Sequence, residues 1–346
     1  MKHEADREPD LLVRREGCAG RITLNRPKAL NSMTYDMAMA IEAALLAWKQ
    51  DDAVLLVLID AAGERAFCAG GDIADLYRTG KAGDFAFGQR FWADEYRLNG
   101  LIADYPKPYV AIMDGIVMGG GVGISAHGSH RIVTERSVLA MPECGIGLVP
   151  DVGGSLLLAR APGHLGEYLG LTGTRISGAD AILTGFADFF VASQHLPELK
   201  TRLCETGDAN VIADFVGSAE IAGLLAWQHR IDPIFGSPLL PDLLGALEAE
   251  ASEWSAQALA AIRRASPLSI ACSFDLIREV RAANTMQAAL DLEYRFSSRC
   301  MEFGDFLEGV RAAIIDKDRM PKWRHDSIAA VSAQERAFML APVVAA

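Results

Sequence analysis

The sequence contains few cysteines, and they are scattered along the chain. Its six cysteines among 346 residues form no C-x-x-C pair and no cluster with histidine. Neither a zinc site nor a disulfide framework is therefore indicated. We expect reduced thiols, no metal and a cytoplasmic location.

Long apolar runs and an excess of basic residues are also lacking. No stretch of about 18 apolar residues is present that could cross a bilayer, and residues 1–10 are polar and lack the apolar core of a signal peptide. The 33 Lys and Arg against 45 Asp and Glu give a formal charge of −12. This balance opposes broad binding to nucleic acid or to an anionic membrane, so an anionic ligand would need a local basic group.

Glycine is concentrated in two loops, at residues 68–72 and 118–123. Neither loop has the lysine of a P-loop or the spacing of a dinucleotide-binding turn, so no NAD or ATP is implied. Glycine lets backbone N–H groups approach a ligand closely, and two such donors can bind one carbonyl oxygen as an oxyanion hole. The alternative is that these glycines only form tight turns.

Strand and helix patterns alternate over the first part of the chain. We expect strands at residues 21–25, 54–59, 109–113, 131–134 and 138–141, with each glycine loop directly after an apolar run, and helices after Thr34 and over 85–103. This alternation predicts an α/β core over residues 11–200. Residues 1–10 form a polar segment, and residues 201–346 read as a helical region, with helices at 239–259 and 286–300.

Several motifs resemble those of the crotonase (enoyl-CoA hydratase/isomerase) superfamily, and most closely its 3-hydroxyisobutyryl-CoA hydrolase branch. The motifs of the superfamily are residues 25–31, 66–72 and 118–123. The motifs of the hydrolase branch are residues 141–143, 147–154, 305–311, 315–318 and 321–323. The resemblance implies a crotonase-like spiral of repeated ββα units with a helical C-terminal layer. It also implies an acyl-CoA thioesterase of valine breakdown that takes coenzyme A as part of its substrate and needs no cofactor. A homo-oligomer is compatible with it, because members commonly form trimers.

One position departs from the hydratase pattern. Hydratases of the superfamily carry a second catalytic glutamate two residues after the triple glycine, and here that position is Gly123. Adding water across a double bond needs a paired acid and base, so Gly123 argues against simple hydratase activity. Double-bond isomerisation and a non-catalytic role in binding coenzyme A remain as alternatives.

The resemblance assigns the catalytic residues. The N–H groups of Gly71 and Gly120 would form the oxyanion hole, and Glu143 would attack the thioester or activate water to do so; both routes stay open. Asp151 would hold the substrate hydroxyl or the leaving sulfur, or share a proton with Glu143. An aspartate at that position could equally cap a helix, and Glu143 could simply begin one.

The remaining candidates would bind the substrate. Glu95 shares a helix face with apolar residues, which is compatible with a substrate contact or with a buried salt bridge. Lys28 and Arg65 would bind the phosphates of coenzyme A, and backbone atoms near Phe67 and Ala69 its adenine. Exposed basic residues are usually only solvated. Two tail lysines are further candidates: Lys317 and Lys322.

Overall fold

The large sheet forms one side of the core. The computed structural model describes residues 8–343, and its six-stranded sheet has the order β1-β2-β3-β5-β7-β10. Only the β1–β2 pair is antiparallel. The strands are β1 (Leu11–Glu16), β2 (Ala19–Leu24), β3 (Leu56–Ala61), β5 (Tyr109–Met113), β7 (His130–Val133) and β10 (Phe189–Phe190).

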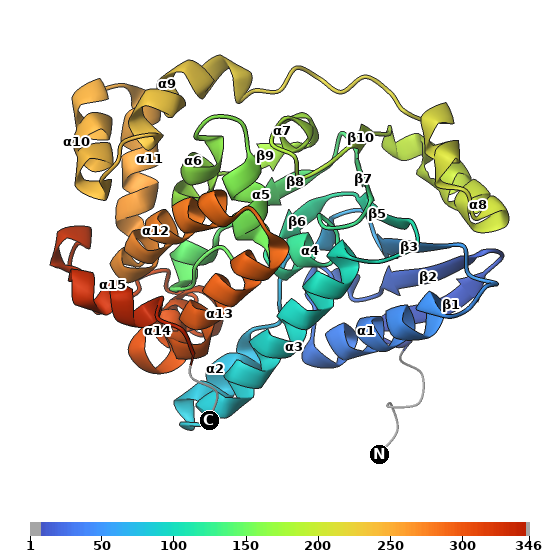
Figure 1. Cartoon of the computed structure of the whole chain (residues 1–346), viewed down its shortest axis with the longest axis horizontal. Coiled ribbons are helices and arrows are strands. Elements are labelled where there is room, and N and C mark those ends of the chain that lie inside the picture. Colours follow the sequence, from blue (N-terminus) through green and yellow to red (C-terminus); the bar gives the residue numbers. More distant parts are fainter. Residues whose placement is uncertain (1–7, 344–346) are drawn as a thin grey trace.

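A smaller sheet lies beside it, in the order β4-β6-β8-β9. Its strands are β4 (Ala66–Cys68), β6 (Ile116–Met118), β8 (Val138–Ala140) and β9 (Ile176–Ser177). The first three are parallel to one another. From β3 to β8 the chain alternates between the large and the small sheet, which is the predicted spiral of ββα units (Figure 1).

The strands that carry the glycine loops differ from those predicted. The loops do not follow directly after the apolar runs at 54–59 and 109–113, which belong to the large sheet. They follow β4 and β6, which have three residues each. A strand of that length is too short to show apolar periodicity, so the sequence pattern missed both.

The helices of the first part of the chain largely agree with the prediction. Thr34 caps α1 (Tyr35–Lys49) by accepting a hydrogen bond from the N–H of Met37 at 3.2 Å, and α3 spans Phe85–Ala103 as expected. The other helices up to residue 206 are α2 (Ala74–Lys81), α4 (Gly120–Gly123), α5 (Gly154–Arg160), α6 (Leu165–Thr172), α7 (Gly178–Leu183) and α8 (Leu196–Thr206).

The C-terminal part of the described chain contains helices and no strands. Its helices are α9 (Leu225–Phe235), α10 (Leu240–Glu250), α11 (Glu253–Arg264), α12 (Pro267–Ala283), α13 (Met286–Phe303), α14 (Phe306–Val310) and α15 (Ala333–Met339). The single helix expected at 239–259 is two helices. Ala251 takes a left-handed φ of 50° and ends α10, and Ser252 caps α11.

The helical layer packs on the core of the same chain. Helix α13 runs against α3, and α12 packs on α5 and α6 (Figure 1). One apolar cluster extends from β2 through α13 to Met339 of α15, and a second joins the large sheet to α8. The predicted boundary at residue 200 falls within α8, which packs on β2 and β3. Of the polar segment predicted at 1–10, the first seven residues lie outside the described part. Within residues 8–343, no helix has the length and apolar character to span a bilayer.

The two glycine loops meet because β4 and β6 are parallel neighbours in the small sheet. Their contact is close: a Cβ atom on Gly121 would lie 2.4 Å from the carbonyl oxygen of Cys68. A backbone atom cannot move aside to make room for that Cβ atom, as the end of a flexible side chain could. A glycine at position 121 is therefore needed for the loops to lie side by side.

We expect Gly121→Ala to lower the free energy of unfolding by about 1–3 kcal/mol, the usual effect of adding a carbon to a filled interior. Urea denaturation measures the change. Gly245→Ala is the matched control, because Gly245 is an exposed residue of α10 and a Cβ there meets nothing within 4 Å. Alanine should be neutral or stabilising at that site. Equal stability of Gly121→Ala and the parent protein would contradict the close-packed arrangement.

Candidate active site

Three parallel strands of the small sheet bring three groups to one edge. Gly71 follows β4, Gly120 follows β6 and Glu143 follows β8. A Cβ atom on Gly120 would lie 3.4 Å from the nitrogen of Gly71 and 3.0 Å from Oε1 of Glu95. A Cβ atom on Gly119 would lie 3.1 Å from Oε1 of Glu143. The structure thus brings together four of the residues predicted from the sequence.

These groups line a cavity of about 390 Å³, a volume typical of small-molecule sites. Its walls are mainly apolar, and three carboxyl groups face it. No lysine or arginine is among its lining residues. Within the described chain, no three His, Cys, Asp or Glu side chains are arranged to hold a metal ion. The lining residues of the cavity include three acids and three large apolar residues: Glu95, Glu143, Asp151, Phe91, Trp92 and Leu148.

The two glycine N–H groups are available to a ligand. Neither Gly71 nor Gly120 appears as a donor in the turn and loop hydrogen bonds of residues 8–343. Gly71 is bridged to Met33, but that bridge uses the carbonyl of Gly70 and the N–H of Asp72. Unused donors beside a cavity are suited to binding a ligand oxygen.

Glu143 is a buried carboxyl group with an unused oxygen. It begins a short 3₁₀ helix (Glu143–Ile146), as one of the alternatives predicted, and it is only 4% exposed. Its Oε2 has no hydrogen-bond partner among the described residues. Burial, and next the nearby charge of Asp151, raise its pKa well above the usual value. A carboxyl group with this environment is poised to accept a proton.

Asp151 faces the same cavity and is held by a tyrosine. The hydroxyl of Tyr96 donates a hydrogen bond to Oδ2 of Asp151 at 2.9 Å. Burial raises the pKa of Asp151 to about 7, and the hydrogen bond from Tyr96 opposes that rise. The expectation that Asp151 caps a helix is wrong. Helix α5 begins at Gly154, and its N-cap residue is Gly153, which has no side chain to accept a capping hydrogen bond.

Glu293 of α13 takes over that capping role, and it was missed in the sequence. The side chain is fully buried and accepts hydrogen bonds from the N–H of Gly153 at 2.8 Å, from the N–H of Ser155 at 3.1 Å and from the hydroxyl of Ser155. Burial raises its pKa to about 8, and these hydrogen bonds oppose the rise. The sequence did contain a sign of this buried role, because Glu293 lies on the apolar face of the helix expected at 286–300. The same pattern had identified Glu95.

The turn that follows Asp151 has one more support. Val152 takes a left-handed φ of 55°, which is strained for a β-branched residue. Nε2 of His127 lies 2.7 Å from the carbonyl oxygen of Val152, and since a carbonyl only accepts, Nε2 donates. Burial lowers the pKa of His127 to about 4, so the ring is neutral at pH 7. Tyr96, His127 and Glu293 together fix the turn that presents Asp151.

Glu95 has no ion pair among the described residues. It is 4% exposed and lines the cavity, and burial, and then Asp151, raise its pKa well above the usual value. The predicted alternative of a buried salt bridge is therefore wrong. The alternative of a substrate contact stays a prediction.

Comparison with known proteins supports the resemblance. The sequence pattern described as enoyl-CoA hydratase/isomerase matches residues 19–340. The chain belongs to the enoyl-CoA hydratase/isomerase family. A relative named 3-hydroxyisobutyryl-CoA hydrolase, mitochondrial, from Gallus gallus is 41% identical over 342 residues, which cover 96% of this chain and 88% of that protein. The predicted family is thus confirmed, whereas the cytoplasmic location stays a prediction.

Solved structures of the family share the fold over almost the whole chain. A protein described as an enoyl-CoA hydratase from Rhodobacter sphaeroides 2.4.1 is 51% identical with a TM-score of 0.94, over 97% of this chain and 98% of that one. A carnitinyl-CoA dehydratase from Mycobacterium thermoresistibile is 42% identical with a TM-score of 0.93, over 97% of this chain and 98% of that one. The predicted crotonase-like fold is confirmed.

Gly123 is the position at which the sequence departs from the expected hydratase pattern. A Cβ atom at this position would lie 2.7 Å from Nδ2 of Asn99 and 2.7 Å from Cβ of Val152. The space of the second hydratase glutamate is therefore occupied by two other side chains. The structure offers no room for that acid.

The residues predicted to bind coenzyme A lie in different surroundings. Ala69 lines the 390 Å³ cavity, whereas Lys28 and Arg65 are exposed and lie outside its lining. The side chain of Phe67 is fully buried in the core, and Phe67 does not line this cavity. Their roles in binding stay predictions.

The raised pKa of Glu293 predicts how stability depends on pH. Its folded pKa of about 8 exceeds the unfolded value of about 4.3, so near neutral pH the folded chain holds a proton that the unfolded chain has released. Raising the pH from 6.5 to 8 then favours unfolding, by up to about 1.4 kcal/mol per pH unit for this group. Glu293→Gln should therefore show a shallower loss of stability than the parent protein.

Urea denaturation at pH 6.5, 7.25 and 8 measures this slope. Glu302→Gln serves as the control, because Glu302 lies on the same helix but is exposed, and it should keep the parent slope. Parallel slopes for Glu293→Gln and the parent protein would show that Glu293 is ionised throughout, contrary to the prediction.

Proposed function

We propose that this protein hydrolyses the thioester of a short 3-hydroxyacyl-CoA, namely 3-hydroxyisobutyryl-CoA, and releases the acid and free coenzyme A in valine breakdown. Relatives about 40% identical over most of the chain carry that name. The observation that carries the proposal is the buried oxygen of Glu143 without a partner, in one cavity with the free N–H groups of Gly71 and Gly120.

The glycine N–H groups would polarise the thioester. Its carbonyl oxygen would accept hydrogen bonds from Gly71 and Gly120, and these bonds strengthen as the oxygen becomes an anion. Loss of one such donor usually raises the barrier by about 2.7–4 kcal/mol. The low polarity of the cavity increases the effect, because few other dipoles screen the charge.

Glu143 would supply the attack in one of two ways. As a general base it takes a proton from water while the water oxygen bonds to the carbonyl carbon; the C–S bond then breaks, and the proton passes to the sulfur. As a nucleophile its carboxylate forms an anhydride and expels the thiolate, and water then hydrolyses the anhydride. Both routes begin with Glu143 ionised.

Asp151 and Glu95 would orient the substrate. Both face the cavity, and burial raises the pKa of each, that of Asp151 to about 7. Asp151 can therefore carry a proton near neutral pH and donate it to a hydroxyl or to the leaving sulfur. The apolar walls formed by Phe91, Trp92 and Leu148 suit a small branched acyl group.

Double-bond isomerisation is the second candidate, favoured by the presence of two carboxyl groups, Glu143 and Asp151, in one cavity. Burial raises the pKa of both, and the charge of Asp151 further raises the pKa of Glu143. In that reaction one of them would carry a proton between two carbons of the acyl chain. No thiol would be released, which separates the two reactions.

We expect Glu143→Gln to lower the rate of thiol release from 3-hydroxyisobutyryl-CoA by at least about 100-fold, because an amide can neither attack the carbonyl nor take a proton from water. A thiol reagent follows the reaction, and calorimetry with coenzyme A should give nearly unchanged affinity. Glu302→Gln, on exposed α13 surface, is the control and should keep the parent rate.

Two results would refute the proposal. A parent protein that converts an unsaturated acyl-CoA without releasing thiol would indicate isomerisation. A parent protein that binds coenzyme A esters but turns over none of a panel of short acyl-CoA thioesters would indicate a binding protein.

A further inference from the structure

Asn99 of α3 is a fully buried amide without a hydrogen-bond partner. Its side chain is 0% exposed, and neither Oδ1 nor Nδ2 meets a partner within residues 8–343. Buried amides are usually paired, because an unpaired one costs free energy. The other buried asparagine of the described chain, Asn31, accepts one hydrogen bond and donates two. The amide of Asn99 thus lowers stability, which indicates a role other than folding.

Asn99 and Glu95 lie one helical turn apart on the same side of α3. Both face α4. A Cβ atom on Gly120 would lie 3.0 Å from Oε1 of Glu95, and a Cβ atom on Gly123 would lie 2.7 Å from Nδ2 of Asn99. Side chains four residues apart on a helix are neighbours and can hydrogen-bond to each other. The amide of Asn99 is therefore within reach of the carboxyl group of Glu95.

Glu95 also lacks a partner of its own. Its side chain forms no hydrogen bond or ion pair with a described residue, so nothing in that part of the chain fixes the direction of its carboxyl group. Burial, and next the charge of Asp151, raise its pKa well above the usual value. An amide can hold either form of this acid, because its oxygen accepts from a protonated carboxyl group and its nitrogen donates to an ionised one.

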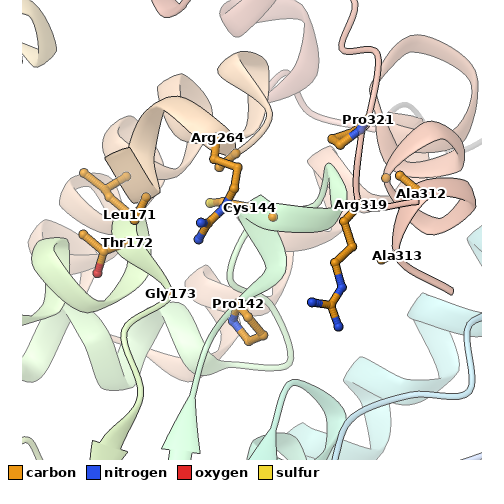
Figure 2. Close-up of a pocket in the computed structure, with 14 residues that line it drawn as sticks. Pro142, Cys144, Leu171, Thr172, Gly173, Arg264, Ala312, Ala313, Arg319 and Pro321 are labelled. Carbon is orange, nitrogen blue, oxygen red and sulfur yellow. The ribbon is translucent and has the colours of Figure 1, made fainter. Parts of the chain in front are cut away.

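Of two neighbouring cavities, the one lined by Glu95 contains the carboxyl groups. Three carboxyl groups line this cavity of about 390 Å³. A second cavity of about 510 Å³ shares Pro142 and Gly145 with it. No carboxyl group of the described chain lines the second cavity, and its charged side chains are Arg264 and Arg319 (Figure 2). Carboxyl oxygens are strong acceptors of a hydroxyl O–H, so the first cavity suits a substrate hydroxyl.

We propose that Asn99 is a positioning residue for substrate selection: its amide hydrogen-bonds to Glu95 in the substrate complex and holds that carboxyl group against the hydroxyl of a 3-hydroxyacyl-CoA. This role rests on the proposed hydrolysis of such a thioester. Asn99 does not line the cavity itself, so it acts through Glu95. A substrate without the hydroxyl makes no use of the fixed carboxyl group, and Asn99 therefore favours hydroxylated acyl groups.

Thiol release from two esters tests this role: 3-hydroxyisobutyryl-CoA, and isobutyryl-CoA, which lacks only the hydroxyl. We expect Asn99→Leu to lower kcat/KM about tenfold or more for the first ester, as for loss of a hydrogen bond to a charged group, and by less than about twofold for the second. Asn210→Leu is the matched control, because it makes the same substitution at an exposed residue. It should keep the parent values for both esters.

Urea denaturation separates this role from a structural one. Leucine has nearly the shape of asparagine, and an apolar group of the same shape is tolerated where an unpaired amide was buried. Asn99→Leu should unfold at the urea concentration of the parent protein or above it. Asn31→Leu, which breaks three hydrogen bonds, should unfold below it. If leucine is not accommodated, the smaller Asn99→Ala should show the same change in substrate preference.

A double-mutant cycle tests whether Asn99 acts through Glu95. Glu95→Met removes the carboxyl group and keeps a long side chain, so adding Asn99→Leu to it should cause no further loss with 3-hydroxyisobutyryl-CoA. A full further loss would overturn the role of Asn99, as would parent-like preference between the two esters in both Asn99 variants. Either result leaves the proposed hydrolysis standing. A parent protein that releases thiol from neither ester would overturn the hydrolysis, and this role with it.

Discussion

Parallel pairing of β4, β6 and β8 is the constraint on which the candidate site depends. Each strand has only three residues, yet the carboxyl ends of neighbouring parallel strands must meet at one edge. Gly71, Gly120 and Glu143 follow those ends and become neighbours although some 70 positions of sequence separate the first from the last. The contact between Gly121 and the backbone of Cys68 fixes the spacing of the first two loops.

Four acidic side chains are buried around that edge. Glu95, Glu143, Asp151 and Glu293 are each at most 4% exposed, and burial raises the pKa of all four. Their surroundings differ. Glu293 is saturated with hydrogen bonds and supports a turn, whereas Glu143 keeps an oxygen without a partner. Such contrast between neighbouring acids is typical of sites that move protons.

Much of this arrangement could be predicted from the sequence. The long apolar strands, the helix at 85–103 and the two glycine loops are local patterns, and the motifs sufficed to identify the family. The short strands of the small sheet are too brief for periodicity. The contacts of Tyr96 with Asp151 and of Glu293 with Gly153 join residues 55 and 140 positions apart, so no local pattern encodes them. The N-cap role assigned to Asp151 was wrong for the same reason: a distant glutamate supplies it.

The filled space at Gly123 also bears on how such proteins diverge. Asn99 and Val152 come from separate segments, and both press on the position where a second acid would stand. A single substitution there would meet two side chains before it gained any chemistry. A change from hydrolase to hydratase at this position would thus have to be accompanied by a shift of the Asn99 side chain and by movement or replacement of Val152.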